Sequence, residues 1–356
     1  MKITMVESVE FEIPWRKPLE EPMKWCGEQG RRGRIHKVYS DEGIVGLCDN
    51  PMDVRGLARR MIGRDPFDFI LDDTVWPLQE AIYDIIAQKL NVPIYKILGK
   101  KCRDRVPVCY WVHHFPPEVL AEEAGLAADS GFKVIKFKSR PYYDVVEQVR
   151  AISDAAPELS IIPDANGSWW LPSRAIKIIK SIEKYEIFCV ESPIPQADVR
   201  GYLRLREKTD IPIAIHMGNP DPITAISTGM CDYFVIEEPG VKRTLQYAAI
   251  AEYASPYESS SGDYGKGFRV GGMPVWLEGF GRTAIAEAFQ IHLASVIEAA
   301  TLPSPFFIHR LREHPLVEDP LEVKGGTVRV PEKPGLGVTL DEAALERYCV
   351  NRIIIQ

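Results

Sequence analysis

The sequence predicts an α/β protein in which a (β/α)8-type barrel is combined with a smaller α+β domain. The chain has 356 residues, which is enough for a barrel of ~250 residues and a second, smaller domain. From Val106 onward, short apolar segments alternate with amphipathic helical segments, which predicts a parallel sheet. Before Val106 the pattern is that of a short antiparallel sheet followed by a helix.

Residues 1–105 form the first predicted domain. Apolar residues alternate near the N-terminus and on both sides of an Asp-Glu-Gly turn, which predicts antiparallel strands. The segment 16–34 is polar and rich in Gly and Arg, so we expect a mobile loop there. Helical spacing predicts a helix within Trp76–Leu98. Residues 317–356 contain a hairpin-like segment, Leu321–Val330, and a Pro-Gly-Leu-Gly turn, Pro334–Gly337, and we expect this C-terminal segment to rejoin the first domain.

Residues 106–316 form the predicted barrel. Helical segments such as Ala175–Tyr185 and Thr283–Ala299 lie between or after its strands. The regular spacing is interrupted by Ser255–Gly272, a segment rich in Ser, Gly and Tyr that we expect to cover the mouth of the barrel. The predicted strands are Val106–Val112, Lys133–Lys138, Ser160–Pro163, Phe188–Val190, Pro212–Ile215, Tyr233–Ile236, Pro274–Leu277 and Phe306–Ile308.

The composition narrows the choice of partner and compartment. The formal net charge is −7, without a block of basic residues, which argues against nucleic acid or an anionic membrane as the partner. The sequence has neither a long apolar run nor an N-terminal signal pattern, so we expect a cytoplasmic protein. The seven cysteines are scattered, which favours neither a disulfide framework nor a zinc knuckle.

Two lysines lie in a segment that otherwise has the pattern of a buried strand. Lys136 and Lys138 are two residues apart within Phe132–Lys138, so strand alternation places both ammonium groups on one face. A buried ammonium group loses its proton or pairs with a carboxylate. A desolvated lysine is therefore a candidate general base. The alternative is an edge strand whose lysines point to water.

Two acids follow the next two predicted strands. Asp164 comes at the end of the third strand and Glu191 at the end of the fourth. Active sites of such barrels lie at the carboxyl ends of the strands, so we expect both acids beside Lys138. Hard oxygen ligands around one point suit Mg²⁺. The alternative is that each acid caps the helix that follows it, but the Lys-x-Lys strand followed by both acids favours a site.

These motifs resemble those of the enolase superfamily, in its mandelate racemase and muconate lactonizing branch. The resemblance covers nearly the whole chain and implies a capping domain built from both termini. It also implies Mg²⁺ and removal of a proton next to a substrate carboxylate, with the metal stabilising the enediolate. The matching segments are Lys136-Phe137-Lys138, Asp164-Ala165-Asn166-Gly167, Val190-Glu191-Ser192-Pro193, Ala81–Gly99, the turn at Leu336, and His292.

Several strand ends depart from the pattern of this branch. His216 ends the fifth strand, where the family usually has a third metal acid, so Mn²⁺ or another divalent cation remains open beside Mg²⁺. We expect Asp164, Glu191 and His216 to converge on one cation. Glu237 ends the sixth strand and Glu278 ends the seventh, where the branch carries other acid/base residues.

Two functions from different classes remain open. The first is a metal-dependent lyase or isomerase that removes the α-proton of an acid sugar, a hydroxy acid or an amino-acid derivative, as a dehydratase, racemase or epimerase. Lys138 would be the base, its pKa lowered by Lys136 and the metal. Lys136 would hold the substrate carboxylate, and Glu237 or Glu278 would act as the acid on the other face of the substrate. The second is a non-catalytic relative retained for ligand binding. In either case we expect a homo-oligomer.

Three weaker signals lie near the expected site. His113 and His114 end the first predicted strand and either line the pocket or are simply exposed. The three arginines within 31–34 either meet an anionic substrate or form a solvated charge run. His309 stands where a glutamate usually closes the eighth strand of the family.

Overall fold

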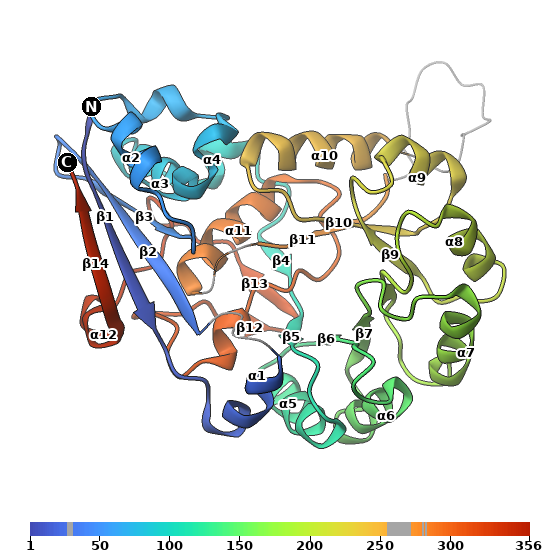
Figure 1. Cartoon of the computed structure of the whole chain (residues 1–356). Coiled ribbons are helices and arrows are strands. Elements are labelled where there is room, and N and C mark those ends of the chain that lie inside the picture. The colour runs from blue at the N-terminus through green and yellow to red at the C-terminus, as the bar shows by residue number, and fades with distance from the viewer. Residues whose placement is uncertain (27–30, 255–271, 280, 282) are drawn as a thin grey trace, which may run out of the picture.

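A computed structural model describes the chain except for residues 27–30, 255–271, 280 and 282. The segment expected to cover the mouth of the barrel, Ser255–Gly272, lies outside the described residues apart from Gly272. Figure 1 shows a curved parallel sheet wrapped by helices on one side of the molecule and an antiparallel sheet that carries both termini on the other. The predicted class, a barrel with an α+β capping domain, is confirmed. None of the described helices is long and apolar enough to cross a membrane.

Seven parallel strands form the curved sheet, and their spatial order follows their order in the chain. Helices lie on the outside of the sheet (Figure 1) because each presents one apolar stripe, as Ala175, Ile179 and Ile182 do in α7. The strands are β5 Tyr110–Val112, β6 Val134–Lys138, β7 Ser160–Asp164, β8 Val190–Glu191, β9 Ile213–His216, β10 Tyr233–Ile236 and β11 Val275–Leu277. The helices are α5 Pro117–Asp129, α6 Val145–Ala155, α7 Pro172–Ile182, α8 Val199–Arg206, α9 Pro222–Thr228, α10 Val241–Tyr253 and α11 Ala284–Val296.

The predicted eighth strand, Phe306–Ile308, is wrong. The chain instead forms a short 3₁₀ helix, η4 Ile308–Leu311, directly after this point. The closing segment joins the residues before β5 through one parallel pair, Val108 with Ser304, and joins β11 through a hydrogen bond from Leu302 N to Val275 O at 3.2 Å. Prolines precede and follow Ser304, and because proline has no N–H to donate, a regular ladder cannot continue along this segment.

A layer of apolar side chains fills the interior of the barrel. Each of the eight positions around the barrel, including the irregular closing segment, contributes one buried residue to this layer. A packed interior of this kind is typical of (β/α)8 barrels. The residues are Cys109, Val134, Ile162, Cys189, Ala214, Val235, Trp276 and Leu302.

The antiparallel sheet contains strands from both ends of the chain. Its order is β14-β1-β2-β3, and Val6 of β1 lies opposite Ile355 of β14. Helix α3 packs against it with an apolar face that includes Ile82 and Ile86. The elements of this region are β1 Ile3–Glu12, β2 Arg32–Ser40, β3 Val45–Asp49, β14 Cys349–Ile355, α2 Arg55–Met61, η2 Pro66–Phe69, η3 Asp73–Leu78, α3 Gln79–Lys89, α4 Tyr95–Leu98 and α12 Glu342–Tyr348.

Two expectations about the connecting segments need correction. The predicted loop 16–34 contains the short helices η1 Lys17–Leu19 and α1 Glu20–Trp25, because Leu19 and Met23 are buried and anchor it to the core. The hairpin within 317–356 does not reach the sheet of the first domain, which this C-terminal segment rejoins through β14 instead. Its strands, β12 Val323–Lys324 and β13 Thr327–Arg329, pair with β4 Arg105–Pro107 in a separate sheet.

The N-terminal region also caps a helix of the barrel. Helix α10 begins after Gly240, which has no side chain to cap it. The carboxylate of Asp73 accepts hydrogen bonds from the backbone N–H of Lys242 at 3.1 Å and of Arg243 at 2.9 Å. Gln79 Oε1 accepts from Val241 N at 3.0 Å. The first turn of α10 is therefore satisfied by residues far away in the sequence.

Candidate active site

Seven polar side chains follow the apolar interior layer toward the carboxyl ends of the strands. Because strand side chains alternate, a residue two positions after an interior residue also points into the barrel. Asp164 follows Ile162 in this way, and Glu278 follows Trp276. The set comprises Lys136, Lys138, Asp164, Glu191, His216, Glu237 and Glu278. These are the seven residues that the sequence predicts for catalysis and metal binding.

Lys136 is completely buried and lies among three carboxylates. Its Nζ is 2.6 Å from Glu191 Oε2 and 3.4 Å from Asp164 Oδ2, and it donates a hydrogen bond to Glu278. Burial alone would lower the pKa of Lys136, but these carboxylates, Glu191 foremost, raise it well above its usual value. Lys136 is therefore a permanent cation that holds the acids of three strands together.

Lys138 lies at the open end of β6, with Nζ 2.5 Å from Asp164 Oδ2. The two residues are register partners in neighbouring parallel strands. Burial and Lys136 both lower the pKa of Lys138, but Asp164, together with Glu278 and Glu191, outweighs them and the pKa is raised. Lys136 thus has the expected lowering effect on the pKa of Lys138, while the direct pairing with Asp164 opposes it and the expected effect of a metal stays a prediction.

His216 connects the acids of β8 and β10. Its Nε2 is 3.1 Å from Glu191 Oε1 and its Nδ1 is 3.5 Å from Glu237 Oε2. Burial alone would lower the pKa of His216, but the hydrogen bond with Glu191 raises it to about 9. Two of the three predicted metal ligands, Glu191 and His216, thus lie in direct contact, whereas their convergence on one cation stays a prediction.

The acids on the far side of the barrel have contrasting environments. Burial and the neighbouring Glu278 raise the pKa of Glu237. Burial would also raise the pKa of Glu278, but Lys136 lowers it to about 2. Glu237 is thus the acid that keeps its proton more readily, and Glu278 is a carboxylate.

The donor set has the chemistry of a divalent-cation site. One ligand atom each of His216, Glu237 and Glu278 lies within 4.8 Å of the other two. Asp164 of β7 and Glu191 of β8 are register partners in neighbouring strands. Glu191 also contacts His216. Carboxylate and imidazole donors that meet at one end of a barrel fit a divalent cation. His216 belongs to both possible ligand groups.

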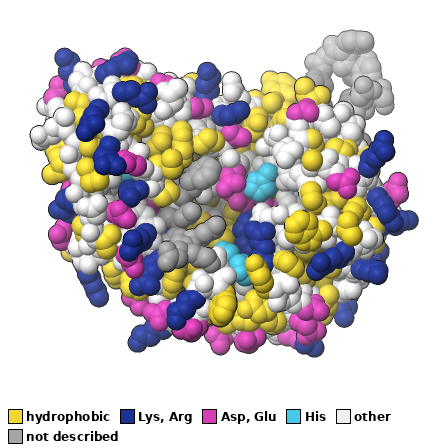
Figure 2. Space-filling view, in the orientation of Figure 1, with side chains coloured by type: hydrophobic (Ala, Val, Ile, Leu, Met, Phe, Trp, Pro, Cys, Tyr) yellow, Lys and Arg dark blue, Asp and Glu magenta, His cyan; other side chains and the backbone are white. Residues whose placement is uncertain are grey.

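Two cavities meet at Lys138. One, of about 140 Å³, is lined by Trp111, Glu237 and Glu278 as well as by Lys138. The other, of about 340 Å³, is also lined by His113 and His114. Figure 2 shows acidic, basic and histidine side chains gathered in the hollow at the middle of this face. The two histidines line a pocket and are buried, which excludes the alternative that they are merely exposed.

The sequence reasoning missed other residues that line these cavities. Trp111 lies two positions after Cys109 of the interior layer, so the same alternation that locates the acids could have located it. Cys26 directly follows the short helix α1, Arg140 lies in the loop after β6, and both line the larger cavity. Neither carries a local pattern that predicts its position.

Two of the weaker sequence signals lie outside the two cavities that meet at Lys138, although Arg31 and Arg32 line a separate cavity of about 580 Å³. His309 is buried in η4 and its Nδ1 pairs with Glu287 of α11. The arginines within 31–34 pair with glutamates of β1, as Arg31 does with Glu12 at 2.9 Å. Both observations favour structural roles, a buried pair for the histidine and a solvated charge run for the arginines.

Over residues 119–254 and 269–344, more than half of its length, the sequence matches the family described as Enolase C-terminal domain-like. The chain belongs to this family. The resemblance to the mandelate racemase and muconate lactonizing branch of the enolase superfamily is thereby confirmed.

Relatives of this enolase-superfamily protein include racemases and dehydratases. An N-succinyl-L-Arg/Lys racemase of Bacillus cereus is 23% identical, with 100% of both chains covered. A D-gluconate dehydratase of Thermoproteus tenax is 26% identical over 83% of this chain, which spans 63% of that relative. Among solved structures, a dipeptide epimerase of Cytophaga hutchinsonii, complexed with Mg and a dipeptide, has a TM-score of 0.77 at 22% identity, with both chains fully covered.

Proposed function

We propose that this protein is a divalent-metal-dependent enzyme that removes the α-proton of a small carboxylate substrate. The observation that carries the proposal is that Lys138, Glu237 and Glu278 line one cavity at the carboxyl end of the barrel. An amine and two acids are thus available to the same substrate from different strands. That its relatives are enolase-superfamily racemases and dehydratases supports the same general reaction.

A divalent cation fits the carboxylate and imidazole donors of the site, and members of the superfamily typically bind one. We propose that Asp164, Glu191 and His216 hold it. When bound, the cation supplies the positive charge that stabilises the enediolate form of the substrate carboxylate. Mg²⁺ suits the two carboxylates, whereas His216 makes Mn²⁺ a close competitor.

Lys138 is the proposed base. Asp164 Oδ2 pairs with Lys138, so a cation that took this oxygen as a ligand would weaken the contact that raises the pKa of the lysine. Lys136, two residues earlier, remains charged and disfavours a second ammonium group nearby. The neutral amine of Lys138 would then accept the α-proton. Lys136 has no exposed surface, so its role is to hold the acids of three strands in place and not, as the sequence suggests, to bind the substrate carboxylate.

Elimination of water from an acid sugar is the reaction favoured by Glu237, which lines the same cavity as Lys138. Burial and Glu278 raise the pKa of Glu237, so this acid is suited to donate a proton to a leaving hydroxyl group. The second candidate is racemisation or epimerisation of an amino-acid derivative. It is favoured by the full-length match to the racemase, and it would use Glu237 or Glu278 as the base on the other face.

Proton exchange in D₂O tests the proposal. The protein is incubated with Mg²⁺ or Mn²⁺ and a panel of acid sugars, hydroxy acids and N-acylated amino acids, and the α-proton is followed by NMR. Elimination gives a new keto acid, whereas racemisation gives deuterium in both enantiomers. Binding of these compounds without any exchange would overturn the catalytic proposal and favour the non-catalytic alternative.

A further inference from the structure

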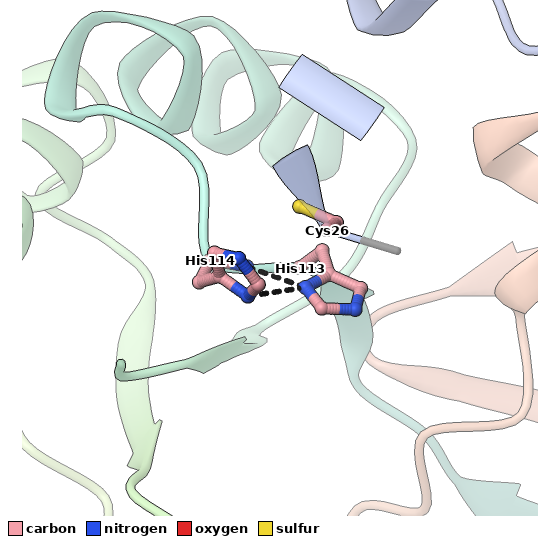
Figure 3. A group of neighbouring side chains, drawn as sticks. All are labelled: Cys26, His113 and His114. Carbon is pink, nitrogen blue, oxygen red and sulfur yellow. Dashed lines mark hydrogen bonds between the residues drawn. The ribbon is translucent and has the colours of Figure 1, made fainter. Parts of the chain in front are cut away.

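A second group of possible metal ligands lies outside the proposed catalytic residues. It consists of Cys26, which follows α1, and of His113 and His114, which follow β5 (Figure 3). One ligand atom from each residue lies within 4.8 Å of the other two. All three residues are at least nine-tenths buried, with exposed fractions of 8%, 5% and 7%. In the part of the chain that the structure describes, this is the one such group that contains a cysteine.

The hydrogen bonds of the histidines leave one buried nitrogen lone pair without a donor. His113 Nδ1 accepts the backbone N–H of His114 at 3.0 Å, so this nitrogen carries no proton. The contact of 2.7 Å between the two Nδ1 atoms is then donated by His114. A neutral His114 ring therefore has its lone pair on Nε2, which is buried and has no hydrogen-bond partner. An unsatisfied buried nitrogen of this kind calls for a ligand.

The surroundings keep both rings neutral, and a cation bound at His113 Nδ1 would displace the hydrogen bonds that this nitrogen accepts. Burial lowers the pKa of His113 to about 3. Burial also lowers the pKa of His114, with a smaller opposing effect from the carbonyl of Trp25. Neutral imidazole is the state in which histidine ligates a cation.

We propose that Cys26, His113 and His114 bind a thiophilic divalent cation of the Zn²⁺ class. One thiolate and two imidazoles are ligands that Zn²⁺ takes in protein sites, whereas Mg²⁺ and Ca²⁺ require oxygen donors. Binding forms a sulfur–metal bond and releases the Cys26 thiol proton to solvent, with no change of oxidation state. This site is separate from the carboxylates that we assign to catalysis.

The position of the site suggests what its cation does. The three residues line the cavity of about 340 Å³ that also contains Lys138 and Arg140. Three protein ligands leave a fourth position for water or for a donor atom of another molecule. A cation here would thus present a second electrophilic centre to the substrate cavity. It would also join the N-terminal segment that carries Cys26 to the barrel strand that ends at the two histidines.

Cobalt serves as the probe, because Co²⁺ replaces Zn²⁺ and absorbs light when it is bound by a thiolate. The full-length protein is titrated with Co²⁺ in the presence of excess Mg²⁺, which occupies hard oxygen sites. We expect one equivalent of Co²⁺ to produce a near-ultraviolet thiolate-to-cobalt band, and Zn²⁺ to abolish it. The Cys102→Ser variant, in which an exposed cysteine is changed, should keep the band. Cys26→Ser should lose it, and His114→Gln should weaken Co²⁺ binding at least tenfold.

Three results would overturn the proposal. They are a wild-type protein that gives no thiolate band with excess Co²⁺, a band that persists in Cys26→Ser, and a band that is lost in Asp164→Asn, which would place the cobalt in the catalytic site. If Cys26→Ser does not fold, the wild-type protein is alkylated with and without Zn²⁺ and modification of Cys26 is measured by mass spectrometry. We expect at least tenfold slower modification with Zn²⁺, and equal rates would contradict the site.

Discussion

Lys138 and Asp164, register partners on neighbouring strands of the barrel, form a close ion pair, with Nζ 2.5 Å from Oδ2. The pair lies beside Lys136, which contacts the acids of three strands. The state of this pair decides whether Lys138 is an ammonium group or an amine. Substitutions of Lys138 and of Asp164 should therefore have separate effects, on proton removal and on metal binding.

Replacing Lys138 by alanine should remove proton abstraction. We expect the rate of α-proton exchange in D₂O to fall by about 10²–10⁴-fold, the usual contribution of a general base. Lys138→Arg should fail nearly as badly, because guanidinium stays protonated. Binding of metal and substrate should persist. The control is Lys133→Ala, an exposed lysine at the other end of the same segment. Exchange that continues in Lys138→Ala would place the base on the opposite face, with Glu237 and Glu278 as candidates.

Metal content should distinguish the two ligand groups that share His216. We expect Asp164→Ala, Glu191→Ala and His216→Ala each to lose bound Mn²⁺ when the purified proteins are analysed by atomic emission. Glu237→Gln should retain it. The reverse pattern, with metal kept in Asp164→Ala and Glu191→Ala but lost in Glu237→Gln, would assign the cation to His216, Glu237 and Glu278. His216→Glu should shift the preference toward Mg²⁺, because it replaces imidazole by a hard oxygen donor.

Removing the charge of Lys136 should destabilise the barrel. Lys136 has no exposed surface and is the common partner of Asp164, Glu191 and Glu278. Lys136→Met leaves these three carboxylates without their shared positive charge. We expect the free energy of unfolding of the metal-free protein to fall by about 3–5 kcal/mol. Denaturant titration measures the change, with Lys133→Met as the control. An unchanged midpoint would show that the acids find other counter-charges.

Stability should depend on pH through Asp84 of α3. This buried carboxylate accepts hydrogen bonds from Leu47 N at 3.0 Å and from Leu336 N at 2.9 Å. Burial raises its pKa from 3.8 to about 6. A folded-state pKa above the unfolded value gives stability that is present at low pH and is lost as the pH rises through the folded-state value.

The comparison with Asp84→Asn isolates this contribution. Between pH 4 and 7, we expect the wild-type protein to lose on the order of 3 kcal/mol relative to the variant. Melting temperatures across this range measure the difference, and exposed Asp319→Asn is the control. Parallel curves for the wild-type protein and Asp84→Asn would contradict the prediction.

The sequence predicts the features that depend on short-range alternation. The strands of the barrel and the seven polar residues at their ends follow from the two-residue period of a strand, as for Lys136 and Lys138. Features that depend on distant partners were not predictable in this way. The pair of Val108 and Ser304 that closes the barrel joins residues near the two ends of the barrel sequence. The raised pKa of Lys138 depends on its distance from Asp164.

The group formed by Cys26, His113 and His114 shows the same limit. Each residue has an ordinary local setting, a short helix in one case and the end of a strand in the others. Their approach depends on how the N-terminal segment lies against the barrel. Seven scattered cysteines gave no spacing that would mark Cys26 as different from the rest.

The position of β1 between β2 and β14 has a consequence for how the protein is made. On the ribosome, β1 emerges early, whereas β14 is translated roughly 15 to 70 s later at typical elongation rates. During that interval one edge of β1 has no native strand beside it, and an open edge can pair with another chain. Glu7 and Glu10 lie on this strand, and their charges oppose such pairing while the nascent chain waits for its final strand.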